Sequence, residues 1–204
     1  MEHSQNNNPL KNPEYLIAFG VVLISVCALV VSIRQTTIMS EQRALMHQQA
    51  KAAVWPRLAM SVGKSHSIED NSVTDYRITV SNAGVGPAII KYVNVSFKGQ
   101  PVSNWWELFR KFEMDENIPL YITNSTISQS IIRQGDDLRI LSLGDNLPLA
   151  QEFLKNSGDI TFEIFYESIY GDMWKYSAGL TSSDDTTESI ETDLVFSQEE
   201  EFKS

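Results

Sequence analysis

The sequence is poor in the residues that thiol and histidine chemistry require. Its 204 residues include one cysteine, Cys27, and three histidines, His3, His47 and His66. A single cysteine excludes an intrachain disulfide, and its place inside an apolar run leaves no thiolate elsewhere in the chain. His3 lies in the N-terminal tail and His47 on the predicted stalk, so we predict no Ser-His or Cys-His arrangement.

Basic residues are also scarce. The chain has 16 Lys and Arg against 26 Asp and Glu, a formal net charge of −10. A nucleic-acid surface would be basic, so we expect no nucleic-acid partner. The imbalance is concentrated at the C-terminus, because residues 181–204 alone carry a net charge of −7. The rest of the chain is therefore nearly neutral.

Charge is absent altogether from residues 16–33, LIAFGVVLISVCALVVSI. This uncharged run of 18 residues lies near the short end of the roughly 17–25 needed to cross a bilayer core. Tyr15 suits the membrane interface on one side, and Arg34 can extend to it on the other. We predict a transmembrane helix over residues 15–34 that contacts membrane lipid through residues 16–33.

Other interpretations of this run fit less well. A cleaved signal peptide has a shorter apolar core followed by a site of small residues. A lipoprotein would need a small residue where Val26 precedes Cys27. A buried helix of a soluble protein usually shows a polar stripe, which this run lacks.

Basic residues flanking the run predict its orientation. Lys11 precedes it, whereas three basic residues follow it closely: Arg34, Arg43 and Lys51. The richer flank is expected in the cytoplasm. We therefore predict a single-pass protein of the inner (plasma) membrane with a cytoplasmic soluble domain.

Residues 35–55 continue the helical pattern as a juxtamembrane stalk that stops at Pro56. A row with seven-residue spacing runs along it: Val31, Ile38, Leu45 and Ala52. Such a row predicts a homo-oligomer paired through the helix over residues 31–52. The alternative is a stalk that lies on the membrane or packs against its own domain.

Residues 56–180 alternate apolar and polar side chains with period two, as β-strands do. Strands are predicted over residues 58–62, 75–82, 88–98, 127–133, 137–143, 159–170 and 173–180. Short helices are predicted over residues 103–112 and 147–156, with Asn104 and Asn146 as caps. The fold class is mainly β: an immunoglobulin-like antiparallel β-sandwich with two short helices, preceded by the long transmembrane and stalk helix.

The two ends of the chain lack such patterns. Residues 1–14 are polar and predict a disordered tail, and residues 181–204 predict an acidic disordered tail. Within the acidic tail, residues 194–196 (LVF) are either a short docking peptide or part of the solvated segment.

The sharpest local motif is the loop over residues 82–88, NAGVGPA. Its glycines could present amides to an anion, but no Lys-Ser/Thr pair follows and Pro87 removes a donor. A tight connection between strands that needs positive φ explains the glycines better.

Polar residues elsewhere fit structure better than chemistry. Ser168 has no histidine near it in sequence, and Glu163 and Glu167 suit a polar strand face better than a glycosidase pair. Three pairs of adjacent acids fall at predicted loops: Glu69 and Asp70, Asp115 and Glu116, Asp136 and Asp137. We predict no catalytic, cofactor-binding or metal-binding residues, and therefore a protein that is not an enzyme.

Three landmarks carry a resemblance to a known group: residues 55–58 (WPRL), residues 82–90 (NAGVGPAII) and residues 166–174 (YESIYGDMW). In this order they resemble a group of uncharacterised bacterial single-pass membrane proteins with an N-terminal span and a C-terminal β-domain carrying an N-x-G-x-G-P-A turn. The resemblance covers residues 15–180 and implies that architecture, with no assigned activity or binding residues.

The predicted function is that of a membrane-anchored, non-enzymatic protein-binding or scaffold module. The sequence does not identify the protein partner. The alternative is a membrane-tethered ligand sensor or hydrolase with a site near the helix of Trp105 and Trp106, since adjacent tryptophans can form a binding platform.

Overall fold

The structure is a computed structural model that describes residues 13–66, 73–115, 117–144, 146–181, 184–190 and 201–203. It divides into two compact units, Met1–Ala50 and Lys51–Ser204. The second unit contains all the strands and is called the head below.

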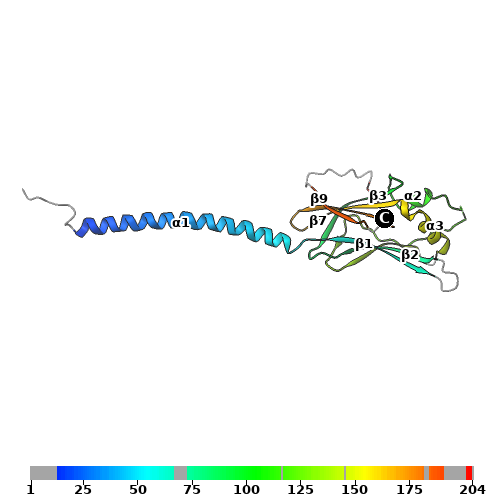
Figure 1. Cartoon of the computed structure of the whole chain (residues 1–204), viewed down its shortest axis with the longest axis horizontal. Helices are drawn as coiled ribbons and strands as arrows, with labels where there is room; N and C mark the ends of the chain where they lie inside the picture. The colour runs from blue at the N-terminus through cyan, green and yellow to red at the C-terminus, as the bar shows by residue number, and fades with distance from the viewer. Residues whose placement is uncertain are drawn as a thin grey trace, which may run out of the picture. The chain divides into compact units, whose positions relative to one another are not determined.

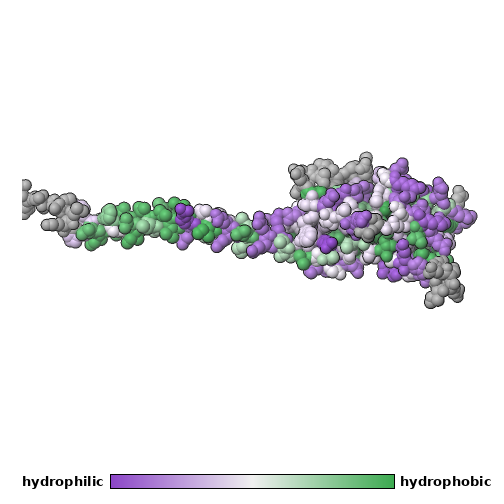
Figure 2. All heavy atoms as spheres, viewed as in Figure 1, coloured by the Kyte–Doolittle hydropathy of each residue, from purple (hydrophilic) through white to green (hydrophobic). Residues whose placement is uncertain are grey.

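The first unit is formed by helix α1 (Pro13–Ala52), which continues two residues into the head. It confirms one unbroken helix through the predicted span and stalk, ending before the predicted residue 55 because residues 53 and 54 form a turn ahead of Pro56. The helix is long and apolar enough to cross a membrane. Its apolar side chains over residues 16–33 are exposed, and they form a continuous hydrophobic stretch in Figure 2.

The head contains two antiparallel sheets in a sandwich-like arrangement (Figure 1). The three-stranded sheet has the order β1 (Leu58–His66), β2 (Val73–Asn82), β6 (Asp137–Ser142). The six-stranded sheet has the order β4 (Gln100–Val102), β3 (Ala88–Phe97), β7 (Ile160–Glu167), β8 (Met173–Gly179), β9 (Thr186–Ile190), with β5 (Ile131–Ile132) also paired to β3. Every pairing is antiparallel, as the alternating sequence predicts.

Two helices and a 3-10 turn join the strands: α2 (Trp105–Arg110), α3 (Leu147–Asn156) and η2 (Ser157–Asp159). Both predicted caps are confirmed. The Asn104 side chain accepts a hydrogen bond from the backbone of Glu107 at 2.9 Å, and that of Asn146 accepts one from Leu149 at 3.3 Å. Each cap satisfies an amide that the first helical turn would leave unpaired.

The core lies between the sheets and beneath the helices. Alternation along the strands brings one buried cluster together, including Ile78, Val80, Val93, Val95 and Ile164. Phe109 of α2 and Phe153 of α3 meet edge to face within it, with ring centroids 6.0 Å apart. The predicted strand over residues 127–133 is shorter than expected, since only Ile131 and Ile132 pair with β3.

The prediction of a disordered tail over residues 181–204 is wrong for two segments. Thr186–Ile190 form β9 on the free edge of β8, where β-branched residues suit an extended backbone. The Phe202 side chain is 1% exposed, because the free energy gained by burying its ring outweighs the preference of the neighbouring acidic residues for water. The LVF cluster at residues 194–196 and residues 1–12 of the predicted N-terminal tail lie outside the described residues.

Asn82 organises the entry of the chain into the head. Its side chain is buried and uses every hydrogen-bonding position it has. The amide oxygen accepts from the backbone N–H groups of Arg57 and Gly84, at 3.2 and 3.0 Å. The amide nitrogen donates to the carbonyls of Gly86 and Ile132, at 2.7 and 2.9 Å. One side chain thereby holds the 82–88 loop, the segment before β1 and strand β5 together.

The glycines of this loop are required by close packing, so the predicted need for positive φ is wrong. Neither Gly84 nor Gly86 has positive φ. A Cβ at Gly84 would lie 2.3 Å from the backbone nitrogen of Arg57, and one at Gly86 would lie 2.0 Å from the carbonyl oxygen of Val54. Backbone therefore passes where a side chain would stand, and Val85 N–H bonds the Trp55 carbonyl at 2.9 Å.

We expect Gly86→Ala to lower the free energy of unfolding of the head by about 3 kcal/mol, because the methyl group must displace backbone. Gly63→Ala is the matched control, since its Cβ would meet Arg77 at an ordinary 3.5 Å. Urea unfolding of the full-length protein, followed by tryptophan fluorescence, measures both. Equal losses in the two variants would contradict this account of the loop.

Candidate functional site

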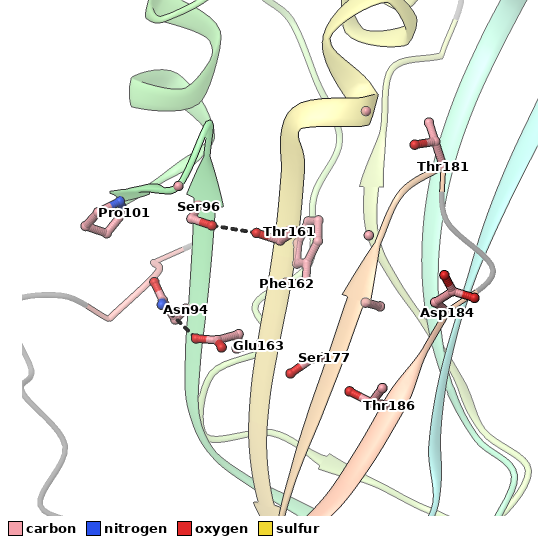
Figure 3. A pocket seen from close by; sticks show the side chains of 14 residues that line it. Asn94, Ser96, Pro101, Thr161, Phe162, Glu163, Ser177, Thr181, Asp184 and Thr186 are labelled. Atoms are coloured by element: carbon pink, nitrogen blue, oxygen red, sulfur yellow. Dashed lines mark hydrogen bonds between the residues drawn. The ribbon is translucent and has the colours of Figure 1, made fainter.

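An open groove with a volume of about 590 Å³ lies on the outer face of the six-stranded sheet (Figure 3). Because side chains alternate along a strand, the residues that face the groove are those whose neighbours fill the core. They are small and polar and come from four strands: Asn94, Ser96, Thr161, Glu163, Ser177 and Thr186. Pro101, Thr181 and Asp184 contribute further lining.

The polar side chains of the groove bond one another across the strands. Ser96 Oγ and Thr161 Oγ1 lie 2.6 Å apart, on residues that pair in the β3–β7 ladder. One row along, Asn94 Nδ2 donates to Glu163 Oε2 at 3.1 Å, and Lys175 Nζ lies 2.5 Å from Glu163 Oε1. The floor of the groove is thus a set of cross-strand pairs that also stabilise the sheet.

Glu163 is held as a carboxylate. Partial burial alone would raise its pKa, but the hydrogen bonds and charge of Lys175 and the amide of Asn94 outweigh burial and lower the pKa below its ordinary value. A glycosidase general acid needs the opposite shift. Glu167, its neighbour on the same face of β7, pairs with Lys91 at 2.7 Å. The geometry gives both carboxylates roles in ion pairs.

The described residues of the groove include no activated nucleophile. Its hydroxyl groups bond each other or lie on strands without a histidine, since His66 stands exposed at the end of β1 and His47 lies on α1. Across the described ranges no three His, Cys, Asp or Glu side chains gather as a metal-binding group. What the groove offers is shape and hydrogen bonding.

The two adjacent tryptophans point to different environments. Trp105 is 2% exposed and packs edge to face on Phe202, with ring centroids 4.9 Å apart, whereas Trp106 is 44% exposed. They therefore do not form a shared platform. A separate open concavity of about 440 Å³ lies at the other end of α2, lined mainly by apolar residues: Phe109, Phe112, Met114, Ile118 and Leu120.

Ser168 has a structural role in the turn between β7 and β8. It is buried, and its Oγ accepts a hydrogen bond from the backbone of Tyr170 at 3.1 Å. Its own N–H bonds the Asp172 carbonyl at 2.9 Å, which closes the hairpin. The serine is thus committed to the turn, and Tyr170 stands in the turn instead of on the strand face with Tyr166.

The loop acids lie apart from the groove. Asp115 accepts hydrogen bonds from Asn117, which lower its pKa and cap the local turn. Asp136 and Asp137 lead into β6, where the Asp136 carbonyl accepts from the Asn82 N–H at 3.2 Å. Glu69, Asp70 and Glu116 lie outside the described residues. Sequence reasoning missed the groove itself, whose only signal was small polar residues at alternate positions of separate strands.

The lowered pKa of Glu163 predicts how the stability of the head changes with pH. A carboxylate whose folded pKa lies below its unfolded value stabilises the fold above the unfolded pKa, about 4.3, and this contribution disappears as pH falls through the folded pKa. We expect Glu163→Gln to lower the urea midpoint at about pH 6 and to match the wild type near about pH 3. Glu113→Gln, at an exposed position, is the control. A pH-independent difference for Glu163→Gln would contradict the assignment.

Comparisons with known proteins do not place this chain in a family. No protein-family model matches it, and no curated protein matches it. What the head does is therefore inferred from its own residues.

Proposed function

We propose that this chain is a single-pass protein of a bacterial inner membrane whose head binds another protein and performs no catalysis. The groove on the six-stranded sheet carries the proposal. It is open and spans four strands, and polar side chains that bond one another across the strands line it. An extended or loop segment of a partner protein could lie across it, with hydrogen bonds to side chains at its rim.

The membrane anchor is supported by the surface of α1. Large apolar side chains such as Leu23, Ile24 and Leu29 are more than half exposed. Exposed apolar surface costs about 25 cal/mol per Å² in water, which lipid would relieve. The flanking Arg34, with Arg43 and Lys51 further on, supports a cytoplasmic head.

The strand order supports an immunoglobulin-like assignment of the head. The pairs β1-β2-β6 and β3-β7-β8 follow the order of an A-B-E sheet facing a C-F-G sheet. The resemblance to single-pass proteins with an N-x-G-x-G-P-A turn agrees with this architecture. Pairing of two copies through residues 31–52 is a further part of the proposal, supported by the single unbroken helix through the heptad row.

A small-ligand sensor or a hydrolase is the second candidate. One specific observation favours it, the concavity of about 440 Å³ beside α2, where apolar side chains stand with Arg110 and Asp115. An apolar ligand bound there would change the fluorescence of the neighbouring Trp106, which packs against Phe109 with ring centroids 6.4 Å apart. A ligand that did so saturably, and lost its effect in Phe109→Ala, would favour this candidate.

The anchor predicts a sharp response to charge within the apolar run. Wild-type protein should remain in membranes after a carbonate wash, and Leu23→Arg with Leu29→Arg should be released, since each central arginine costs about 3 kcal/mol on insertion. Leu45→Arg, on the stalk, should stay membrane-bound. Retention of the double variant, or release of the wild type, would contradict the anchor.

The groove predicts site-specific crosslinking in the living cell. A photoreactive residue at Ser177, inside the groove, should give discrete adducts whose partner mass spectrometry identifies. The same residue at Ser61, exposed on β1 of the other sheet, is the control and should give none of them. Adducts at Ser177 should disappear when Thr161→Arg fills the groove. Adducts that are identical at both positions would overturn the assignment of the groove.

A further inference from the structure

Strand β3 has one edge that its neighbours fill only at the two ends. β5 pairs with Ala88 and Ile89 at the start, and β4 pairs with residues 95–97 at the finish. Between them lies the carbonyl of Val93, which accepts a hydrogen bond at 2.8 Å from the backbone of Phe202. The C-terminal residues 201–203 therefore complete the edge of the sheet. We call this part of β3, between β4 and β5, the edge gap.

The occupant of the edge gap is held like a bound peptide. The Phe202 ring is 1% exposed and stands edge to face on Trp105. Its neighbours bond to either side of the gap: Lys203 N–H donates to the Ser103 carbonyl at 2.7 Å, and Ser128 Oγ donates to the Glu201 carboxylate. A backbone hydrogen bond to a sheet edge, together with one side chain in a pocket, is a feature of recognition by strand addition.

The described part of this attachment consists of three residues. Only residues 201–203 are described there, and residues 191–200 separate them from the end of β9. A tethered segment benefits from a high local concentration, so it can hold a site that the same peptide, free in solution, would occupy weakly. Removing it need not disturb any other strand pairing, because β4 and β5 contact β3 independently.

Trp105, whose ring packs on Phe202, has one unused donor. The indole Nε1 of Trp105 is buried and has no hydrogen-bond partner among the described residues. Buried donors are normally paired, so an occupant whose acceptor reaches the indole would satisfy it. Residues 201–203 leave this hydrogen bond unmade.

We propose that the edge gap is an acceptor site for an extended peptide bearing an aromatic side chain preceded by an acidic residue, and that the chain closes it with its own C-terminus. A partner segment of this chemistry displaces residues 201–203 and adds to β3 in their place. The site adjoins the groove on the outer face of the sheet, since Asn94 of β3 belongs to both, and it adds a regulated contact to the proposed function.

The test releases the tail without deleting the rest of the head. A protease site replaces residues 192–196 in the full-length protein, and a fluorescent peptide of residues 197–204, SQEEEFKS, reports binding by anisotropy. After cleavage and removal of the fragment, we expect the peptide to bind at least about tenfold more tightly than to the uncut protein. The same peptide with F202A should lose at least about tenfold in affinity.

Paired variants separate the gap from the nearby surface. Trp105→Leu should weaken peptide binding by the cut protein, whereas Trp106→Leu, on the exposed side of α2, should leave it unchanged. A cut head that keeps its fold but binds neither peptide, or both equally, overturns the proposal. A head that unfolds once the fragment leaves also overturns it, since residues 201–203 would then be a permanent strand. Crosslinking at Ser177 tests the groove, and therefore the proposed function, independently of these peptide-binding results.

Discussion

The four hydrogen bonds of the Asn82 side chain hold the head to the chain that enters it. They join the segment before β1, the 82–88 loop and β5, three segments that are far apart in sequence. Each bond pairs a backbone group at a site that is 1% exposed, where an unpaired group is costly. Gly84 and Gly86 matter because they let these backbones approach, and β5 in turn defines one end of the gap that residues 201–203 occupy.

A second polar group joins the two sheets. The Tyr176 hydroxyl accepts from the Met60 N–H of β1 at 2.7 Å and donates to Asp185 at 2.6 Å. Burial, followed by the nearby Asp185 carboxylate, raises the pKa of Tyr176, so the hydroxyl keeps its proton at pH values where an ordinary tyrosine ionises. An amide on the edge of β1 is thereby paired inside the protein, which leaves that edge less open to adventitious strand addition.

The two surfaces that we propose as binding sites for polypeptide offer different interactions. The groove on the six-stranded sheet offers paired polar side chains and an open shape, which suits a contact that exchanges water for hydrogen bonds. The edge gap offers backbone pairing and an aromatic pocket, which suits one anchoring side chain. A membrane helix would confine both surfaces to the layer next to the bilayer, where partners that share the membrane are concentrated.

Local physics determined what could be derived from the sequence alone. The charge-free run at residues 16–33, the alternation of β2, β3, β7 and β8, and the caps Asn104 and Asn146 depend on neighbours along the chain. Only the tertiary structure decided the groove, the packing role of Gly84 and Gly86, strand β9 and the burial of Phe202. Each of these depends on a surface made by distant segments: four strands line up the groove, and Phe202 is buried because β4 and β5 leave a space on β3. The acidic composition of residues 181–204 predicted a solvated tail. That prediction missed Phe202, because the pocket that receives its ring exists only once the sheet has formed.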